Sequence, residues 1–188
     1  LEGIEQDQVT REQRGRAKAV NFGIIYGQGA FGLARGLGIT RAEAAKFIDE
    51  YKERYPGITG FMETCVSEAE KNGFVTTMLG RRRPISEIHS NNRNLRALGE
   101  RLAINTVVQG SAADMIKQAM VNLHERIDRE ELDMRLLIQV HDELVLDAPL
   151  EKVEEYSEVV RQEMAGAIEL AVPVKVDVAW GKNWLESK

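Results

Sequence analysis

Two apolar segments that flank a short polar step constrain the fold of this chain most strongly. Residues 134–140 read MRLLIQV and residues 143–149 read ELVLDAP, with His141 and Asp142 between them. Short segments rich in Leu, Ile and Val that are joined by two polar residues are typical of a tight antiparallel β-hairpin. The pattern therefore predicts a hairpin that carries His141, Asp142 and Glu143 at its tip.

Helical patterns fill most of the chain before this hairpin. Thr40 is a favourable N-cap and Glu43 follows three residues later as a capping box, so a helix is expected to run from there to just before Pro56. The other elements predicted in this half are a helix over 11–27 that is ended by glycines 27, 29 and 32, a helix over 57–71 that stops at Gly73, a hairpin that turns near Gly80, and a long helix over 91–128.

The segment QGSAAD, residues 109–114, is expected to interrupt this long helix. Its small residues would let another backbone or a ligand approach closely. Beyond the apolar hairpin, the pattern predicts a helix over 150–168 and a half-buried strand in VPVKVDVAWG, residues 172–181. A mostly helical first half followed by strands close in sequence predicts an α+β fold with an antiparallel sheet.

Charge is distributed unevenly along the chain. The formal net charge is −5, yet residues 71–105 carry seven bases and two acids, a local balance of +5. Acids dominate between residues 125 and 169. One face could therefore hold a polyanion while the acidic face stays in water or binds cations. The alternative is that both are solvated helix faces, which is the preferred interpretation for EKVEEYSEVVRQE, residues 151–163.

Cysteine content and hydropathy limit the classes of protein. Cys65 is the only cysteine, which excludes an internal disulfide and a Cys-based zinc site. The longest apolar runs are too short to cross a bilayer, and the N-terminus has no signal-peptide pattern. We therefore expect a cytoplasmic protein with no membrane partner.

Four residues spaced by four form a candidate nucleotide-binding stripe on the helix predicted over 11–27. They are Arg14, Lys18, Phe22 and Tyr26. Each step of four drifts only about 40° around a helix, so two cations and two aromatic rings share one face. Arg and Lys suit the oxygens of a triphosphate, and an aromatic ring offers a flat surface for a base or sugar. An ordinary amphipathic helix explains the spacing equally well.

The acids at the tip of the apolar hairpin are a candidate metal site. Burying a carboxylate among apolar strands costs several kcal/mol of free energy, unless a cation or another ligand compensates for the lost hydration. Mg²⁺ takes oxygen ligands and suits Asp142 and Glu143, but two-metal phosphoryl transfer needs acids from at least two elements. The alternative is a solvated turn with two acids.

A weaker pattern lies on the helix predicted over 91–128. Arg101, Asn105 and Gln109 again recur every four residues, and all three can donate hydrogen bonds to acceptors at a groove edge. Polar helix faces are common, so the spacing alone favours an ordinary solvated face.

Taken together, these motifs resemble family A DNA polymerases, the bacterial DNA polymerase I type. RGRAKAVNFGIIYG (14–27) resembles the fingers-helix motif of that family, QVHDELV (139–145) resembles a palm motif with one catalytic aspartate, and ERLAINTVVQGSAADMIKQAM (100–120) resembles its template-primer helix. The order of the motifs and the ending VDVAWGKNWLE extend the resemblance over essentially the whole chain. It implies a helical fingers subdomain over 1–90, with a nucleotide-binding helix at 11–27, and the C-terminal half of an antiparallel-sheet palm over 91–188.

The resemblance also implies roles for the four residues of the stripe. Arg14 and Lys18 would bind the incoming dNTP triphosphate, and Lys18 would donate a proton to the departing pyrophosphate. Phe22 would stack against the sugar and base of the nucleotide, and Tyr26 would guard the template base. Gly15 stands where a second Arg is frequent, which would reduce affinity for phosphate.

For the remaining motifs the resemblance implies contacts with primer-template DNA and Mg²⁺. The residues are Arg101, Asn105 and Gln109 at the minor groove, His141 near the primer end, Asp142 on the metals and Glu143 beside them.

One palm motif of the family has no counterpart here. That motif contributes the first metal-binding aspartate and should precede the fingers helix, but this chain begins too late to hold it. We therefore expect a fragment of a DNA-directed DNA polymerase that is monomeric in its full-length form and inactive as an isolated piece. The alternative is a catalytically inactive module that binds primer-template or dNTP.

Overall fold

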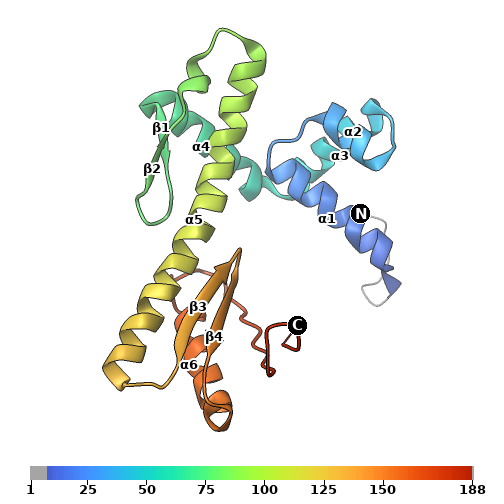
Figure 1. Ribbon diagram of the computed structural model, residues 1–188. Coiled ribbons are helices and arrows are strands. Elements are labelled where there is room, and N and C mark those ends of the chain that lie inside the picture. Colours follow the sequence, from blue (N-terminus) through green and yellow to red (C-terminus); the bar gives the residue numbers. More distant parts are fainter. Residues whose placement is uncertain (1–7, 188) are drawn as a thin grey trace. The chain divides into compact units, whose positions relative to one another are not determined.

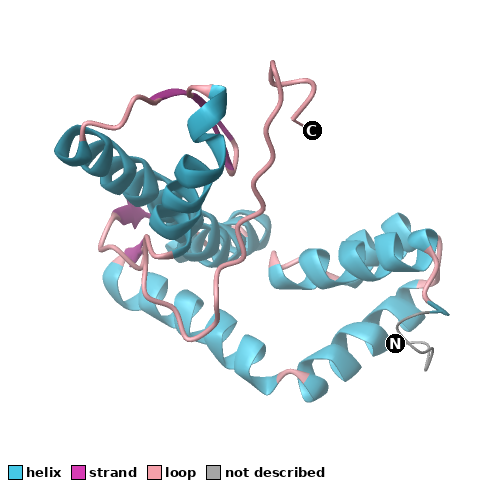
Figure 2. Ribbon diagram, turned by 90° about the horizontal axis from the view of Figure 1, so that it is seen from below, coloured by secondary structure: helices cyan, strands magenta, loops and turns pink. Residues whose placement is uncertain are grey.

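The computed structural model describes residues 8–187, which fall into two compact units that meet in sequence at Gly110 and Ser111 (Figure 1). The first unit contains α1 (Arg11–Ile25), α2 (Ala30–Leu37), α3 (Arg41–Arg54), α4 (Pro56–Asn72), β1 (Phe74–Thr76), β2 (Arg82–Pro84), η2 (Ser86–His89) and the beginning of α5 (Arg93–Glu130). The second contains the end of α5, β3 (Arg135–Val140), β4 (Glu143–Asp147), η3 (Leu150–Lys152) and α6 (Val153–Ala165). Helices predominate and the strands form small antiparallel sheets, so the predicted α+β class is confirmed (Figure 2).

The helix starts and stops in the first half follow the capping chemistry of the sequence. The Thr40 hydroxyl accepts from the Glu43 N–H at 3.2 Å, and the Glu43 carboxylate accepts from the Thr40 N–H at 2.8 Å. This reciprocal pair is the predicted capping box. The Thr40 hydroxyl also donates to the Glu43 carboxylate at 2.7 Å, and this bond, together with the one from the Thr40 N–H, lowers the pKa of Glu43. Gly73 ends α4 with a left-handed φ of 74°, also as predicted.

Gly32 does not end a helix as the sequence pattern suggested. It lies inside α2, where a Cβ would sit 2.9 Å from the Gln28 side chain. Gly27 does break the chain direction, with a left-handed φ of 76° directly after α1. The glycine at position 32 therefore serves close packing, whereas the one at position 27 serves the turn.

Two apolar clusters stabilise the first unit. One joins α1, α2 and α3 through six buried residues, namely Val20, Ile24, Leu33, Ala34, Ala44 and Tyr51. The other joins α4, β1, η2 and α5 through Ala69, Val75, Ile85, Ile88 and Ala103. The clusters fix α1 by its Val20 and Ile24 side and fix α5 by its Ala103 side, and none of the predicted stripe residues belongs to either cluster.

Helix α5 is continuous over 38 residues, so the predicted interruption at residues 109–114 is wrong. A single glycine costs a helix only about 1 kcal/mol, which packing can offset. The close approach expected at these small residues is present, because a Cβ at Gly110 would lie 2.6 Å from the Thr77 methyl group. The small residue therefore serves contact with the β1–β2 hairpin rather than a break in the helix.

The second unit is built around the predicted apolar hairpin. β3 and β4 pair antiparallel with Val140 opposite Glu143, which leaves His141 and Asp142 as the two-residue turn. Helix α6 covers a core of Leu123, Met134, Tyr156, Val159 and Val160. This helix is shorter than the predicted 150–168, since its first turn is the 3₁₀ helix η3 and it ends before Gly166.

The strand predicted over residues 172–181 is absent; this stretch is irregular, as the loop colouring in Figure 2 shows. A β-strand is stabilised by ladder partners, and among residues 8–187 β3 and β4 pair only with each other. The alternating sequence of residues 172–181 therefore has no ladder partner within this part of the chain. Across the same residues, no helix combines the length and the apolar character that a bilayer crossing requires.

Candidate functional site

The stripe predicted on α1 forms a continuous set of contacts. The Lys18 ammonium lies 5.7 Å from the centre of the Phe22 ring, and the Phe22 and Tyr26 rings stack at 5.8 Å with an interplanar angle of 20°. Arg14 lies one turn before Lys18 and is exposed. Phe22 is 42% exposed, which is high for an aromatic side chain. The structure thus presents a cation and a stacked aromatic pair to solvent on one helix face.

A hydrogen bond from α3 to a residue beside the stripe helps to hold α1 in place. The Tyr51 hydroxyl on α3 donates to the Asn21 side-chain oxygen at 2.6 Å. Burial raises the pKa of Tyr51, which keeps the hydroxyl a donor. At the start of α1, Thr10 and Gln13 form a capping box that the sequence analysis did not identify. The helix is therefore fixed at its start and in its middle without using the exposed stripe.

The end of α1 meets the second predicted stripe. Gly27 follows Tyr26 with a left-handed φ, and a Cβ there would lie 2.8 Å from Cγ of Arg101. The aliphatic part of Arg101 on α5 therefore packs against the turn that follows Tyr26. The structure thus brings together one member of the α5 stripe and the aromatic end of the α1 stripe.

Further along α5, Asn105 and Gln109 lie one and two turns beyond Arg101. Asn105 is half-buried, and its Oδ1 atom has no hydrogen-bond partner among residues 8–187. A buried acceptor without a partner is unfavourable by about 1–3 kcal/mol. Gln109 is exposed.

The tip of the β3–β4 hairpin differs from the expectation of buried acids. His141, Asp142 and Glu143 are all exposed, so the argument that desolvated carboxylates require a cation does not apply to this structure. His141 has a φ of 52°, an uncommon conformation for a residue other than glycine, and its carbonyl accepts from the Gln139 amide. The solvated-turn alternative for the two acids therefore remains open.

The carboxylates at this tip fit Mg²⁺ in chemistry but not in number. Asp142 and Glu143 offer the oxygen ligands that Mg²⁺ prefers. Within residues 8–187, no group of three or more His, Cys, Asp or Glu side chains is placed to hold a metal ion. Within the described part of the chain, the two acids at the tip are therefore too few to form a metal site by themselves.

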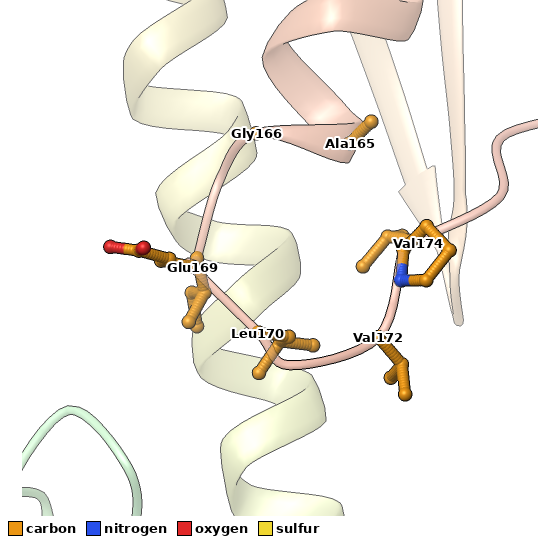
Figure 3. Close-up of a pocket in the computed structure, with 8 residues that line it drawn as sticks. Ala165, Gly166, Glu169, Leu170, Val172 and Val174 are labelled. Atoms are coloured by element: carbon orange, nitrogen blue, oxygen red, sulfur yellow. The ribbon is translucent and has the colours of Figure 1, made fainter.

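A pocket of about 330 Å³ lies elsewhere in the second unit, in the loop that follows α6 (Figure 3). Its lining is mainly apolar, and the Glu169 side chain extends away from Val174 in the close-up. None of the predicted site residues lines it. The lining contains no cation for a triphosphate, so the pocket is not the nucleotide site suggested by the motifs.

Two polar side chains near the stripes escaped the sequence analysis. Gln28 lies between α1 and α2, where a Cβ at Gly23 or Gly32 would come within 3.0 Å of its side chain. Thr106 on α5 accepts a hydrogen bond from Arg83 at 3.0 Å. Neither belongs to a spaced pattern, but the glycines at 23 and 32 were a signal of close packing.

Comparison with known proteins assigns the chain to a family. The family model described as DNA polymerase family A matches residues 1–186, nearly the whole sequence. This chain belongs to DNA polymerase family A. Among curated members, DNA polymerase I of Lactococcus lactis subsp. lactis is 53% identical over 187 residues, and that of Bacillus caldotenax is 50% identical over 185 residues.

These family A relatives are much longer than the present chain. The matches cover 99% and 98% of this chain but 21% of each relative, so the chain spans about a fifth of their length. A solved structure, the POL domain of Pol1 from M. smegmatis in complex with DNA primer-template and dNTP, matches with a TM-score of 0.93 and 40% identity. That match covers 98% of this chain and 32% of the solved chain.

Proposed function

We propose that the chain is the part of a DNA-templated DNA polymerase that binds the incoming dNTP and the primer-template and supplies one of the metal-binding acids. The observation that carries this proposal is the match over 98% of the chain to a polymerase domain solved with primer-template and dNTP. The exposed stripe on α1 supplies suitable binding chemistry.

In this proposal the α1 stripe binds the nucleotide. Arg14 and Lys18 bind the triphosphate, for which a guanidinium fork and a compact ammonium are complementary. Phe22 stacks on the sugar and base, and Tyr26 lies against the template base. Their existing stacking at 5.8 Å means that little side-chain freedom is lost when a ligand binds.

The α5 stripe and the tip of the β3–β4 hairpin act on the DNA and the metal. Arg101, Asn105 and Gln109 donate to minor-groove acceptors, which look alike in every correct base pair and therefore report shape rather than sequence. His141 lies near the primer end. Asp142 would hold Mg²⁺ with Glu143 beside it, and Mg²⁺ bound there would supply stabilisation of the negative charge on the reacting phosphate.

The reaction is attack of the primer 3′-hydroxyl on the α-phosphate of the dNTP, with pyrophosphate as the leaving group. A bond forms between the primer 3′-oxygen and the α-phosphorus, the bond between the α- and β-phosphates breaks, and the proton of the 3′-hydroxyl passes to water. Lys18 donates a proton to the departing pyrophosphate, and Arg14 stays bound to the same phosphates. Selectivity comes from the fit of the nascent pair between the α1 aromatic rings and the template.

Replacing Lys18 by Ala in the complete gene product should slow the single-turnover incorporation rate by about 100-fold, the lower range for a lost general acid. Lys18→Arg should keep most of the nucleotide affinity but stay slow, since a guanidinium does not give up its proton in proteins. Lys46→Ala is the control, because that exposed lysine on α3 pairs with Glu50. Rapid-quench kinetics measure all three. An unchanged rate in Lys18→Ala would remove the proton-donor role.

The second candidate is a nucleic-acid or dNTP-binding module without catalysis. It is favoured for the isolated 188 residues because the described part brings no three metal-binding side chains together. If the 188-residue chain binds primer-template tightly but incorporates no nucleotide, the result favours this binding module over an active polymerase.

We also propose a subdomain organisation, an oligomeric state and a cellular location for this protein. We assign the fingers to residues 1–90 and the C-terminal half of the palm to residues 91–188, although the two compact units divide at Gly110. The full-length protein is proposed to be a monomer. A cytoplasmic location and a role in DNA replication or repair follow from its proposed substrates.

A further inference from the structure

Two arginines of strand β2 have the position and the charge to bind an anion. Arg82 and Arg83 are exposed, and neither forms an ion pair within the described residues. Each is held by a neutral group instead: Arg82 lies 4.9 Å from the centre of the Phe74 ring, and Arg83 donates to the Thr106 hydroxyl at 3.0 Å. The two guanidinium groups are thus oriented while their charges stay available for an anion.

The two arginines lie on opposite faces of the hairpin. Arg83 pairs with the buried Val75, and Arg82 pairs with Thr76. Successive residues of a strand point to opposite faces, so Arg83 shares the face of Val75 that packs on α5. Arg82 shares the other face with Phe74. A ligand on the α5 side would therefore meet Arg83 and not Arg82.

The hairpin is fixed to α5 at a second point. Thr77, only 5% exposed, accepts from the Arg81 N–H and closes the turn. Its methyl group occupies the space that a Cβ at Gly110 would need. Gly110 lies four residues, one helical turn, beyond Thr106. Two contacts to one helix hold the Arg83 side of the hairpin in place before any ligand binds.

Thr106 connects Arg83 to the stripe proposed to face DNA. Thr106 and Gln109 are three residues apart on α5, so they are neighbours on its surface. Arg83 uses one of its N–H groups on Thr106, and a guanidinium has five. The remaining donors extend the row of Arg101, Asn105 and Gln109 by a charge-bearing group.

We propose that Arg83, positioned by Thr106, is a phosphate-binding residue that contacts the DNA backbone beside the bases faced by the α5 stripe. The proposal rests on the proposed function, because it names a contact to the same primer-template. The contact is independent of sequence, since the phosphate group is the same at every nucleotide. It adds affinity and fixes register rather than reading a base.

The salt dependence of DNA binding tests this directly. Each phosphate contact contributes about 0.9 to the slope of log K against log salt. In the complete gene product, Arg83→Gln should reduce the magnitude of the slope by about 1 on primer-templates of unrelated sequence. Arg82→Gln is the matched control, with the same charge change one residue away on the opposite face, and should leave the slope unchanged.

A second pair of variants tests the positioning by Thr106. Thr106→Val removes the hydroxyl but keeps the size, so affinity should fall about threefold to tenfold, as for one lost hydrogen bond of about 1 kcal/mol. The slope should stay near that of the unsubstituted protein because Arg83 keeps its charge. Thr106→Ser keeps the hydroxyl and should restore the affinity.

The outcomes separate this proposal from the proposed function. If the unsubstituted protein binds primer-template but Arg83→Gln leaves the slope unchanged, the Arg83 contact is wrong and the polymerase proposal stands. If Arg82→Gln lowers the slope as much as Arg83→Gln, general basic charge rather than a positioned residue is responsible, and the proposal fails. If the unsubstituted protein does not bind primer-template, both proposals fail.

Discussion

Replacing Asp142 by Ala in the complete gene product should abolish Mg²⁺-dependent nucleotide incorporation. Metal ions contribute several kcal/mol of charge stabilisation to such reactions, and each 1.4 kcal/mol corresponds to a factor of ten. The expected fall in the single-turnover rate is therefore about a thousandfold or more. Because Asp142 is exposed at the hairpin tip, its replacement should not disturb the fold.

Asp147→Ala provides the matched control for this experiment. Asp147 is an exposed acid at the other end of β4, where it lies opposite Arg135. The Asp147→Ala variant should retain activity, since Asp147 is separated from the hairpin tip by the length of β4. Retained incorporation in Asp142→Ala would remove that residue from the metal site and favour the solvated-turn interpretation of the hairpin.

Gly99→Ala should destabilise the α4–α5 part of the first unit by about 2 kcal/mol. A Cβ at Gly99 would lie 2.7 Å from the Ile88 backbone nitrogen, and 2.9 Å from both the Glu87 carbonyl carbon and the Ile88 Cα. Backbone atoms cannot move aside as a side chain can, so overpacking of up to about 3 kcal/mol should outweigh the gain of about 1 kcal/mol from placing Ala in a helix.

Gly60→Ala should change the stability in the opposite direction from Gly99→Ala. Gly60 lies inside α4, and nothing lies within 4 Å of the position of its added Cβ. The substitution should therefore stabilise α4 by about 0.5–1 kcal/mol. Hydrogen exchange followed by mass spectrometry measures the effect of each substitution on local stability. Amides near residues 85–103 should exchange roughly 30 times faster in Gly99→Ala than in the unsubstituted protein, and they should show no such increase in Gly60→Ala. Equal exchange in the two variants would contradict the close packing at Gly99.

Local chemistry made much of the fold predictable from the sequence. The capping box at Thr40 and Glu43, the left-handed stop at Gly73 and both hairpin turns depend on neighbouring residues, and all are confirmed. The spacing of the α1 residues likewise predicts a shared helix face, and on that face Lys18, Phe22 and Tyr26 contact one another in turn. Patterns of period four are local, so they are visible without the tertiary structure.

The errors arose where distant residues decide the outcome. Gly110 does not break α5 because Thr77, remote in sequence, packs against it. The alternation of residues 172–181 predicts a strand only if a ladder partner exists, which is a property of the sheet rather than of the segment. The hydrogen bond from Arg83 to Thr106 joins residues 23 apart in sequence, and a count of charges could not reveal it.

Primer extension with a primed template, dNTPs and Mg²⁺ tests whether this chain is part of a DNA polymerase. The 188-residue chain and the complete gene product would be assayed side by side under the same conditions. We expect incorporation by the complete gene product and none by the 188-residue chain, because no three His, Cys, Asp or Glu side chains within residues 8–187 are placed to hold a metal ion. Failure of the complete gene product to extend the primer, despite binding it, would contradict the polymerase assignment and favour a binding module.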